Sequence, residues 1–150
     1  MADSMKTILI VEDDADWREL LTMIATRLGH AVVIAVNGED AVQQAFLTRP
    51  DLILMDLGLP KLTGDQATIR IKSDPATKDI PIVIQTAYGM VPNAKRAMEA
   101  GAADIMHKPI SITEIYAILK KYLSAEAQVS TANYHFSAGQ VQEAINMTRC

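Results

Sequence analysis

A fivefold alternation of short apolar segments with segments of helical periodicity restricts the fold of this chain more than any other feature. The apolar segments span residues 7–11, 31–35, 51–55, 81–85 and 103–107. The first four are aliphatic runs without clean polar alternation, which is typical of strands buried on both faces of a sheet. The fifth, "ADIMH", is less apolar and fits an edge strand.

Apolar residues between these segments recur at helical spacing, most clearly at positions 17, 20, 21, 24 and 28. Further helices are predicted around residues 41–46, 64–72, 92–100 and 112–122. A β-α unit repeated five times predicts an α/β fold, a doubly wound parallel sheet with helices on both faces. In such sheets ligands bind beyond the carboxyl ends of the strands, so the residues there are the candidates for a functional site.

The composition, 49% hydrophobic and 21% charged residues over 150 positions, fits one globular domain. A net charge of −4 without a basic cluster predicts that the chain does not bind DNA. The only cysteine is Cys150, so neither a disulfide framework nor a metal-thiolate site is expected. The apolar run at residues 7–11 is too short for a signal peptide or a membrane span, which predicts a cytoplasmic protein that does not contact the membrane.

Polar residues with a common chemical logic follow the predicted strands. Glu12 and Asp13 come after the first strand, Asp56 after the third, Thr86 after the fourth and Lys108 after the fifth. Carboxylates that converge at one edge repel each other unless a cation lies among them, and oxygen ligands of this kind suit Mg²⁺. A carboxylate can also act as a nucleophile and form an aspartyl phosphate. Asp56 is therefore predicted to accept a phosphoryl group, Glu12 and Asp13 to bind the metal, and Thr86 and Lys108 to contact phosphoryl oxygens.

Four sequence motifs, "ILIVEDD", "LILMDLGLPKLTG", "PIVIQTA" and "GAADIMHKPIS", resemble those of the CheY-like receiver domains of response regulators. The match covers about residues 5–123, in the family's order and spacing. The resemblance implies a flavodoxin-like fold with five parallel strands in the order 2-1-3-4-5. It also implies phosphoryl transfer to Asp56 from a phosphohistidine on a sensor histidine kinase or histidine phosphotransfer protein.

The resemblance further assigns roles within the predicted site. It implies that Mg²⁺ is held by Asp13, by Asp56, by the backbone carbonyl of Gly58 and, through water, by Glu12. It implies a cis peptide bond between Lys108 and Pro109. The domain is expected to switch between two states without turning over a substrate as an enzyme does.

One position departs from the family pattern. Many receivers carry an aromatic residue three positions before the lysine, where this chain has Ile105. We expect signalling to depend on movement of the loop after the fourth strand, with Tyr88 as a candidate substitute ring. In that loop, Met90 and Val91 either form part of a partner surface or pack on the core.

Residues 1–123 are expected to form the receiver domain, and residues 124–150 a tail made of a linker and a possible short helix. A tail of this length is too short for a DNA-binding domain, which predicts a stand-alone regulator acting on a downstream protein target. Oligomeric state and pathway are left open by the sequence.

Three other functions are alternatives to the signalling switch. A receiver-shaped module that binds partners without being phosphorylated is kept as an alternative because of Ile105. A Mg²⁺-dependent aspartyl-phosphate phosphohydrolase is disfavoured, because such enzymes usually have a second aspartate where this chain has Gly58. A flavodoxin-like cofactor site is disfavoured, because the acidic residues after the first strand would repel a phosphate.

Overall fold

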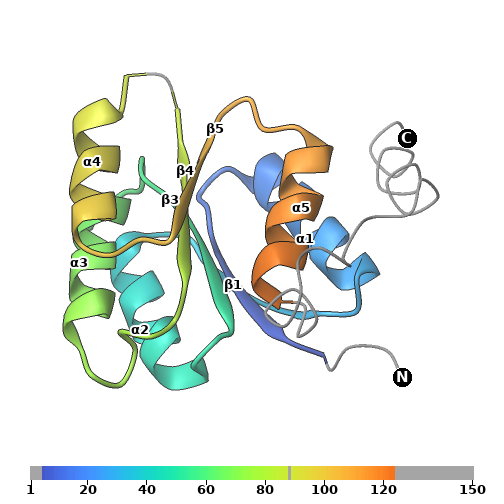
Figure 1. Ribbon diagram of the computed structural model, residues 1–150, viewed down its shortest axis with the longest axis horizontal. Coiled ribbons are helices and arrows are strands. Elements are labelled where there is room, and N and C mark those ends of the chain that lie inside the picture. Colours follow the sequence, from blue (N-terminus) through green and yellow to red (C-terminus); the bar gives the residue numbers. More distant parts are fainter. Residues whose placement is uncertain (1–4, 88, 124–150) are drawn as a thin grey trace.

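The structure, a computed structural model, describes residues 5–87 and 89–123 of the chain. Strands and helices alternate strictly along it (Figure 1). Their bounds are β1 Thr7–Val11, α1 Ala15–Arg27, β2 Ala31–Ala35, α2 Gly38–Thr48, β3 Leu52–Asp56, α3 Gly64–Ser73, β4 Ile82–Thr86, α4 Val91–Glu99, β5 Asp104–His107 and α5 Ile112–Leu123. Tyr88 and the predicted tail at 124–150 lie outside the described residues, as do the predictions made for them.

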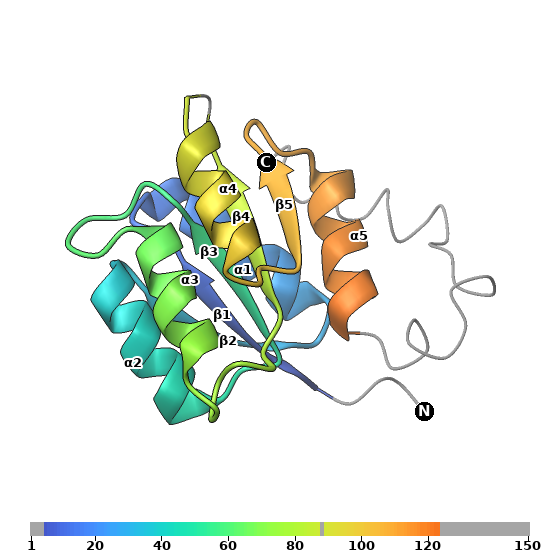
Figure 2. The same ribbon diagram turned by 60° about the vertical axis from the view of Figure 1, so that its left-hand side comes forward.

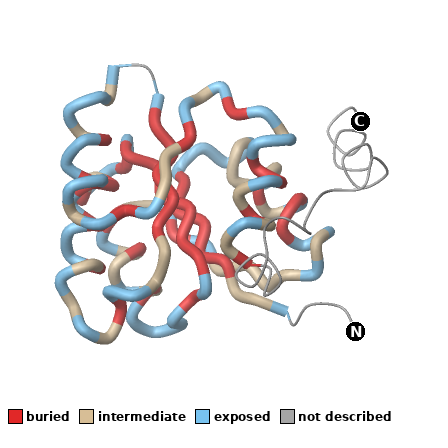
Figure 3. Tube along the Cα trace, in the orientation of Figure 1, coloured by how far each residue is buried: buried red, intermediate tan, exposed pale blue. Residues whose placement is uncertain are grey.

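All five strands in the described residues are parallel, in the order β2-β1-β3-β4-β5, which confirms the predicted doubly wound sheet. Helices α1 and α5 cover one face, and α2, α3 and α4 cover the other (Figures 1 and 2). Successive side chains of a strand enter opposite cores: Leu9 and Val11 pack with α2, α3 and α4, whereas Ile8 and Ile10 pack with α1 and α5. The sheet is thus the middle layer of three (Figure 3).

The prediction of four fully buried strands holds for β1, β3 and β4 in the centre but is wrong for β2. Strand β2 lies at one edge of the sheet that the described residues form, and Ile34 is 36% exposed. The prediction that the fifth strand lies at an edge is confirmed. A strand's position in the sheet depends on its pairing, so the apolar residues of β2 did not reveal that it lies at an edge.

Side chains define where several helices begin. The Asp14 carboxylate accepts hydrogen bonds from the backbone N–H groups of Asp16 and Trp17, as expected for the N-cap of α1. Ser111 accepts a hydrogen bond from the backbone N–H of Glu114 and starts α5 in the same way. The spacing of Ala41, Val42, Ala45 and Phe46 predicts an apolar stripe on α2, but Phe46 does not share the burial of the others: it is 50% exposed, and its ring lies 5.0 Å from the Arg49 guanidinium.

Met90 and Val91, the two apolar residues after β4, differ in their burial. Met90 is half-buried against the core, whereas Val91 is 73% exposed. No helix in the described part of the chain is long and apolar enough to cross a membrane.

Candidate functional site

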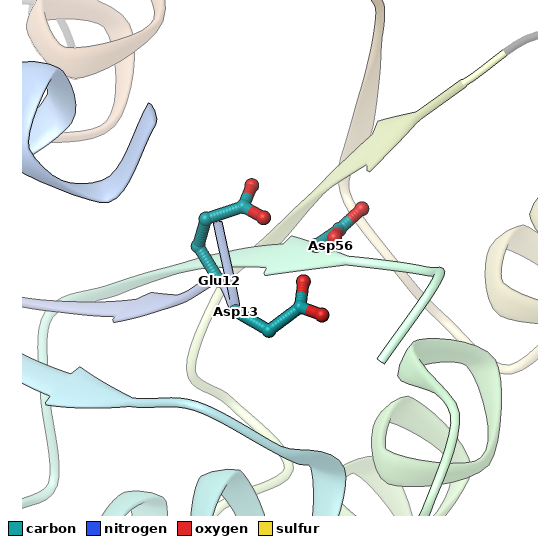
Figure 4. A group of neighbouring side chains, drawn as sticks. All are labelled: Glu12, Asp13 and Asp56. Carbon is teal, nitrogen blue, oxygen red and sulfur yellow. The ribbon is translucent and has the colours of Figure 1, made fainter. Parts of the chain in front are cut away.

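Three carboxylates meet where β1 and β3 end. Asp56 is the last residue of β3, and Glu12 and Asp13 directly follow β1. One oxygen from each lies within 4.8 Å of the other two, and the three side chains point into the same space (Figure 4). Glu12 and Asp56 are almost completely buried, at 1% and 6% exposure, whereas Asp13 is exposed. The three carboxylates therefore form a half-open acidic cluster at the carboxyl edge of the sheet, where the sequence predicts a site.

Close backbone packing places Asp56 beside the start of α3. The N–H of Gly64 donates to the carbonyl of Leu57 at 3.1 Å, and the N–H of Leu57 donates to the carbonyl of Gln85 at 3.2 Å. A Cβ atom on Gly64 would overlap the backbone carbonyl oxygen of Asp56. Sequence reasoning identified Gly64 only as the start of a helix and missed this contact, because it joins residues eight apart through a loop.

The ammonium group of Lys108 supplies the positive charge of the cluster. Its Nζ lies 3.2 Å from Oε1 of Glu12 and 3.5 Å from Oδ1 of Asp56. Burial, together with the negative charge of Asp56, raises the pKa of Glu12 to about 7, although Lys108 opposes that rise. Burial alone would lower the pKa of Lys108, but the charges of Asp56 and Glu12 outweigh it and raise that pKa above its ordinary value. One lysine thus only partly compensates the carboxylates.

Thr86 ends β4 next to this cluster. It is 3% exposed, and its hydroxyl donates to the carbonyl of Ala87 at 3.2 Å. The backbone N–H of Lys108 donates to the carbonyl of Thr86 at 2.8 Å, so the exits of β4 and β5 are held together. The peptide bond between Lys108 and Pro109 is cis. Gly58 is exposed, and a methyl group added to it would meet no atom within 4 Å.

A cavity of about 700 Å³ opens between α4 and β5. Thr86, Ile105 and Lys108 line it from the sheet. Val91, Ala94 and Met98 line it from α4. Ile105 is only half-buried there. The position at which an aromatic residue is expected from the sequence motifs therefore borders this cavity.

Two contacts near the cluster were not predicted from the sequence. The guanidinium of Arg18 donates to the backbone carbonyl of Glu12 at 3.0 Å. The indole N–H of Trp17 donates to Oε1 of Gln85 at 2.6 Å, while Nε2 of Gln85 is buried without a partner among the described residues. The sequence does contain a signal for the second contact: Gln85 lies within an apolar strand, and a buried amide needs hydrogen-bond partners.

Replacement of Lys108 by methionine is expected to lower stability in a pH-dependent way. The variant keeps the apolar stem but leaves Glu12 and Asp56 without their cation, so the pKa of Glu12 should rise further above its ordinary value. Without metal, unfolding in denaturant should show a loss of about 1 kcal/mol at pH 8 and a smaller loss at pH 5.5, where Glu12 is protonated. Lys121→Met, which removes an exposed pair with Asp104, is the control. Equal losses at both pH values for Lys108→Met would contradict the charge argument.

Comparison with known proteins connects this geometry to a family. Residues 8–120 match the response regulator receiver domain. Phosphate regulon transcriptional regulatory protein PhoB of Pseudomonas aeruginosa is 40% identical over 118 residues, which are 79% of this chain and 52% of PhoB. Polar-differentiation response regulator DivK of Brucella anthropi is 33% identical over 118 residues, which are 79% of this chain and 96% of DivK. The chain spans about half the length of its PhoB relatives.

Solved structures show the same likeness. The receiver domain of sensor histidine kinase PA1611 from Pseudomonas aeruginosa has a TM-score of 0.74 and 30% identity, covering 81% of this chain and 100% of that domain. That structure has a magnesium ion coordinated in its active site cleft.

Proposed function

The chain belongs to the response regulator receiver family, and from that premise we propose that it is a phosphorylation-controlled signalling switch whose phosphoacceptor is Asp56. The observation that carries the proposal is the acidic cluster of Glu12, Asp13 and Asp56 with the ammonium of Lys108 beside it. Receiver domains are signalling domains, so the chain is not proposed to turn over a substrate.

The proposed reaction is a phosphoryl transfer to a carboxylate. An oxygen of Asp56 attacks the phosphorus of a phosphohistidine, the phosphorus–nitrogen bond breaks with its electron pair going to the imidazole, and an acyl phosphate forms. The ammonium of Lys108 lies within 3.5 Å of Asp56 and offsets negative charge on the transferred group. The Thr86 hydroxyl exchanges its bond to the Ala87 carbonyl for one to a phosphoryl oxygen.

Mg²⁺ is the proposed cofactor, because hard carboxylate oxygens are the ligands that it prefers and the cluster offers three carboxylates in one half-open space. Asp13, Asp56 and the backbone carbonyl of Gly58 would hold it, with Glu12 acting through water. When bound, it supplies positive charge that neutralises the phosphoryl oxygens. The magnesium ion in the PA1611 receiver domain supports this assignment by likeness.

The proposed partners are a phosphohistidine donor and a downstream protein. The donor is a sensor histidine kinase or a histidine phosphotransfer protein, because a phosphohistidine provides the labile phosphorus–nitrogen bond that the reaction needs. The output is a protein contact on the surface around β4, α4 and β5, since Thr86 and Lys108 connect the acidic cluster to this region.

The test is the mass of the intact protein after incubation with acetyl phosphate and Mg²⁺. The wild type should gain one phosphoryl group, and Asp56→Asn should gain none, because an amide is a poor nucleophile. Asp16→Asn, which changes an exposed carboxylate outside the cluster, should react like the wild type. Omission of Mg²⁺ should suppress the adduct.

Ile105 and the adjoining cavity favour one second candidate, a receiver-shaped module that binds partners without being phosphorylated. Absence of an adduct in folded wild-type protein would favour that candidate. A phosphohydrolase stays disfavoured, because Gly58 provides no second acid for turnover.

A further inference from the structure

A buried carboxylate outside the acidic cluster joins two helices. Asp65 lies in the first turn of α3 and is 2% exposed. Its Oδ2 accepts a hydrogen bond from Nε of Arg96 at 3.0 Å, and its Oδ1 accepts one from Nδ2 of Asn93 at 3.3 Å. Both donors belong to α4, which lies beside α3 in two views (Figures 1 and 2). One buried charge therefore receives two donors from the neighbouring helix.

The charge of Asp65 depends on these donors. Burial alone would raise the pKa of its carboxyl, but hydrogen bonds from Thr63, Arg96 and Asn93 outweigh burial and hold that pKa below its ordinary value. A buried carboxylate that loses its partner is strongly destabilised, because water cannot replace the lost contact. If α3 moves at its first turn, α4 must follow or the pair must break.

Asp65 is also fixed to the phosphoacceptor through the backbone. It directly follows Gly64, whose N–H binds the carbonyl of Leu57 and whose Cα packs against the carbonyl of Asp56 so closely that a Cβ would overlap it. A shift in the backbone at Asp56 therefore displaces the first turn of α3. On the other side of α4, Val91, Ala94 and Met98 line the cavity that contains Thr86 and Lys108.

We propose that Asp65 is a positioning residue that couples the loop after Asp56 to α4 through Arg96 and Asn93. The inference rests on the proposed function for its role in signalling, although the mechanical coupling itself exists without phosphate. Energetic coupling is reciprocal, so a substitution on α4 must also change the stability of the loop after Asp56. A pair that only attaches α4 to the surface of α3 would leave that loop unaffected.

Amide hydrogen exchange measured by mass spectrometry tests the reciprocal effect without phosphate. Arg96→Gln should speed exchange in residues 57–66 as well as in α4, by at least about fivefold in each. Arg96→Lys, which keeps the charge, should restore slow exchange in both segments. Lys121→Gln, which breaks the Asp104–Lys121 pair at 3.2 Å between β5 and α5, is the matched control and should change neither segment. Faster exchange confined to α4 would overturn the inference.

A second measurement adds acetyl phosphate and Mg²⁺. In the wild type, the adduct should change the hydrogen exchange of α4. Asp65→Asn should form as much adduct as the wild type, but the change in α4 should be smaller by at least about half, because the residue that carries the coupling has lost its charge. An equal α4 response in Asp65→Asn would overturn the inference. If the wild type forms no adduct, the proposed function fails, and the phosphate-free comparison still decides whether Asp65 couples the two segments.

Discussion

Replacement of Gly64 by alanine is expected to destabilise the protein by about 3 kcal/mol, because the added methyl group must displace backbone atoms. The Cβ atom would overlap the carbonyl oxygen of Asp56 and would lie 2.8 Å from Cα of Leu57. Neither atom can move alone, since Asp56 belongs to the fully buried strand β3. Chemical denaturation followed by circular dichroism should show the loss, which corresponds to a fall in melting temperature of roughly 10 °C.

Gly58→Ala is the matched control, because it adds the same methyl group two residues after Asp56 in open space. Its free energy of unfolding should stay within about 0.5 kcal/mol of the wild type, as for an exposed substitution without a steric conflict. Equal destabilisation by both substitutions would contradict the assigned contact between Gly64 and the backbone of Asp56. A stable Gly64→Ala protein would contradict it as well.

Local sequence patterns predicted the architecture because most of the strands and helices have a recognisable local signal. Apolar runs without alternation indicated buried strands, and helical spacing of apolar residues indicated α1. The errors are small where they are local: β3 and β4 begin and end one residue later than predicted. Phe46 is exposed because an apolar stripe can extend beyond the face that a neighbouring layer covers.

The sequence predicted the part of the candidate site that is formed by residues at the carboxyl ends of the strands. Parallel strands bring their carboxyl ends to one edge, so Glu12, Asp13 and Asp56 could be expected together before any distance was known. The link from Asp65 to Arg96 joins residues 31 positions apart on two helices, and neither residue is unusual in its own segment. Such contacts depend on how helices pack, which residue spacing within one helix does not describe.

Millimolar Mg²⁺ is expected to raise the melting temperature strongly at pH 8 and only weakly at pH 5.5. The pKa of Glu12 in the folded protein is about 7, above its ordinary value of 4.5, so the folded state binds more protons than the unfolded state between these values. Stability without metal should therefore fall as pH rises through this window, by up to about 3 kcal/mol, and should level off above it.

Metal binding is expected to reverse this loss, because Mg²⁺ favours the deprotonated form of the carboxyl groups around it. At a Mg²⁺ concentration 100-fold above the dissociation constant, stabilisation of the native state is about 2.7 kcal/mol. At pH 5.5 Glu12 is protonated, which already relieves the repulsion between the carboxylates, so Mg²⁺ binding adds less stability. Differential scanning fluorimetry over both pH values and a series of Mg²⁺ concentrations measures the effect.

The acidic cluster can be tested apart from the phosphoryl transfer. Asp13→Asn should lose most of the Mg²⁺ response at pH 8, whereas Asp16→Asn, an exposed carboxylate outside the cluster, should keep it. An identical response at both pH values, or in both variants, would exclude Glu12 and Asp13 as the source of the effect. Because Mg²⁺ binding needs no phosphate donor, a normal response in a protein that forms no adduct would separate an intact metal site from a working switch.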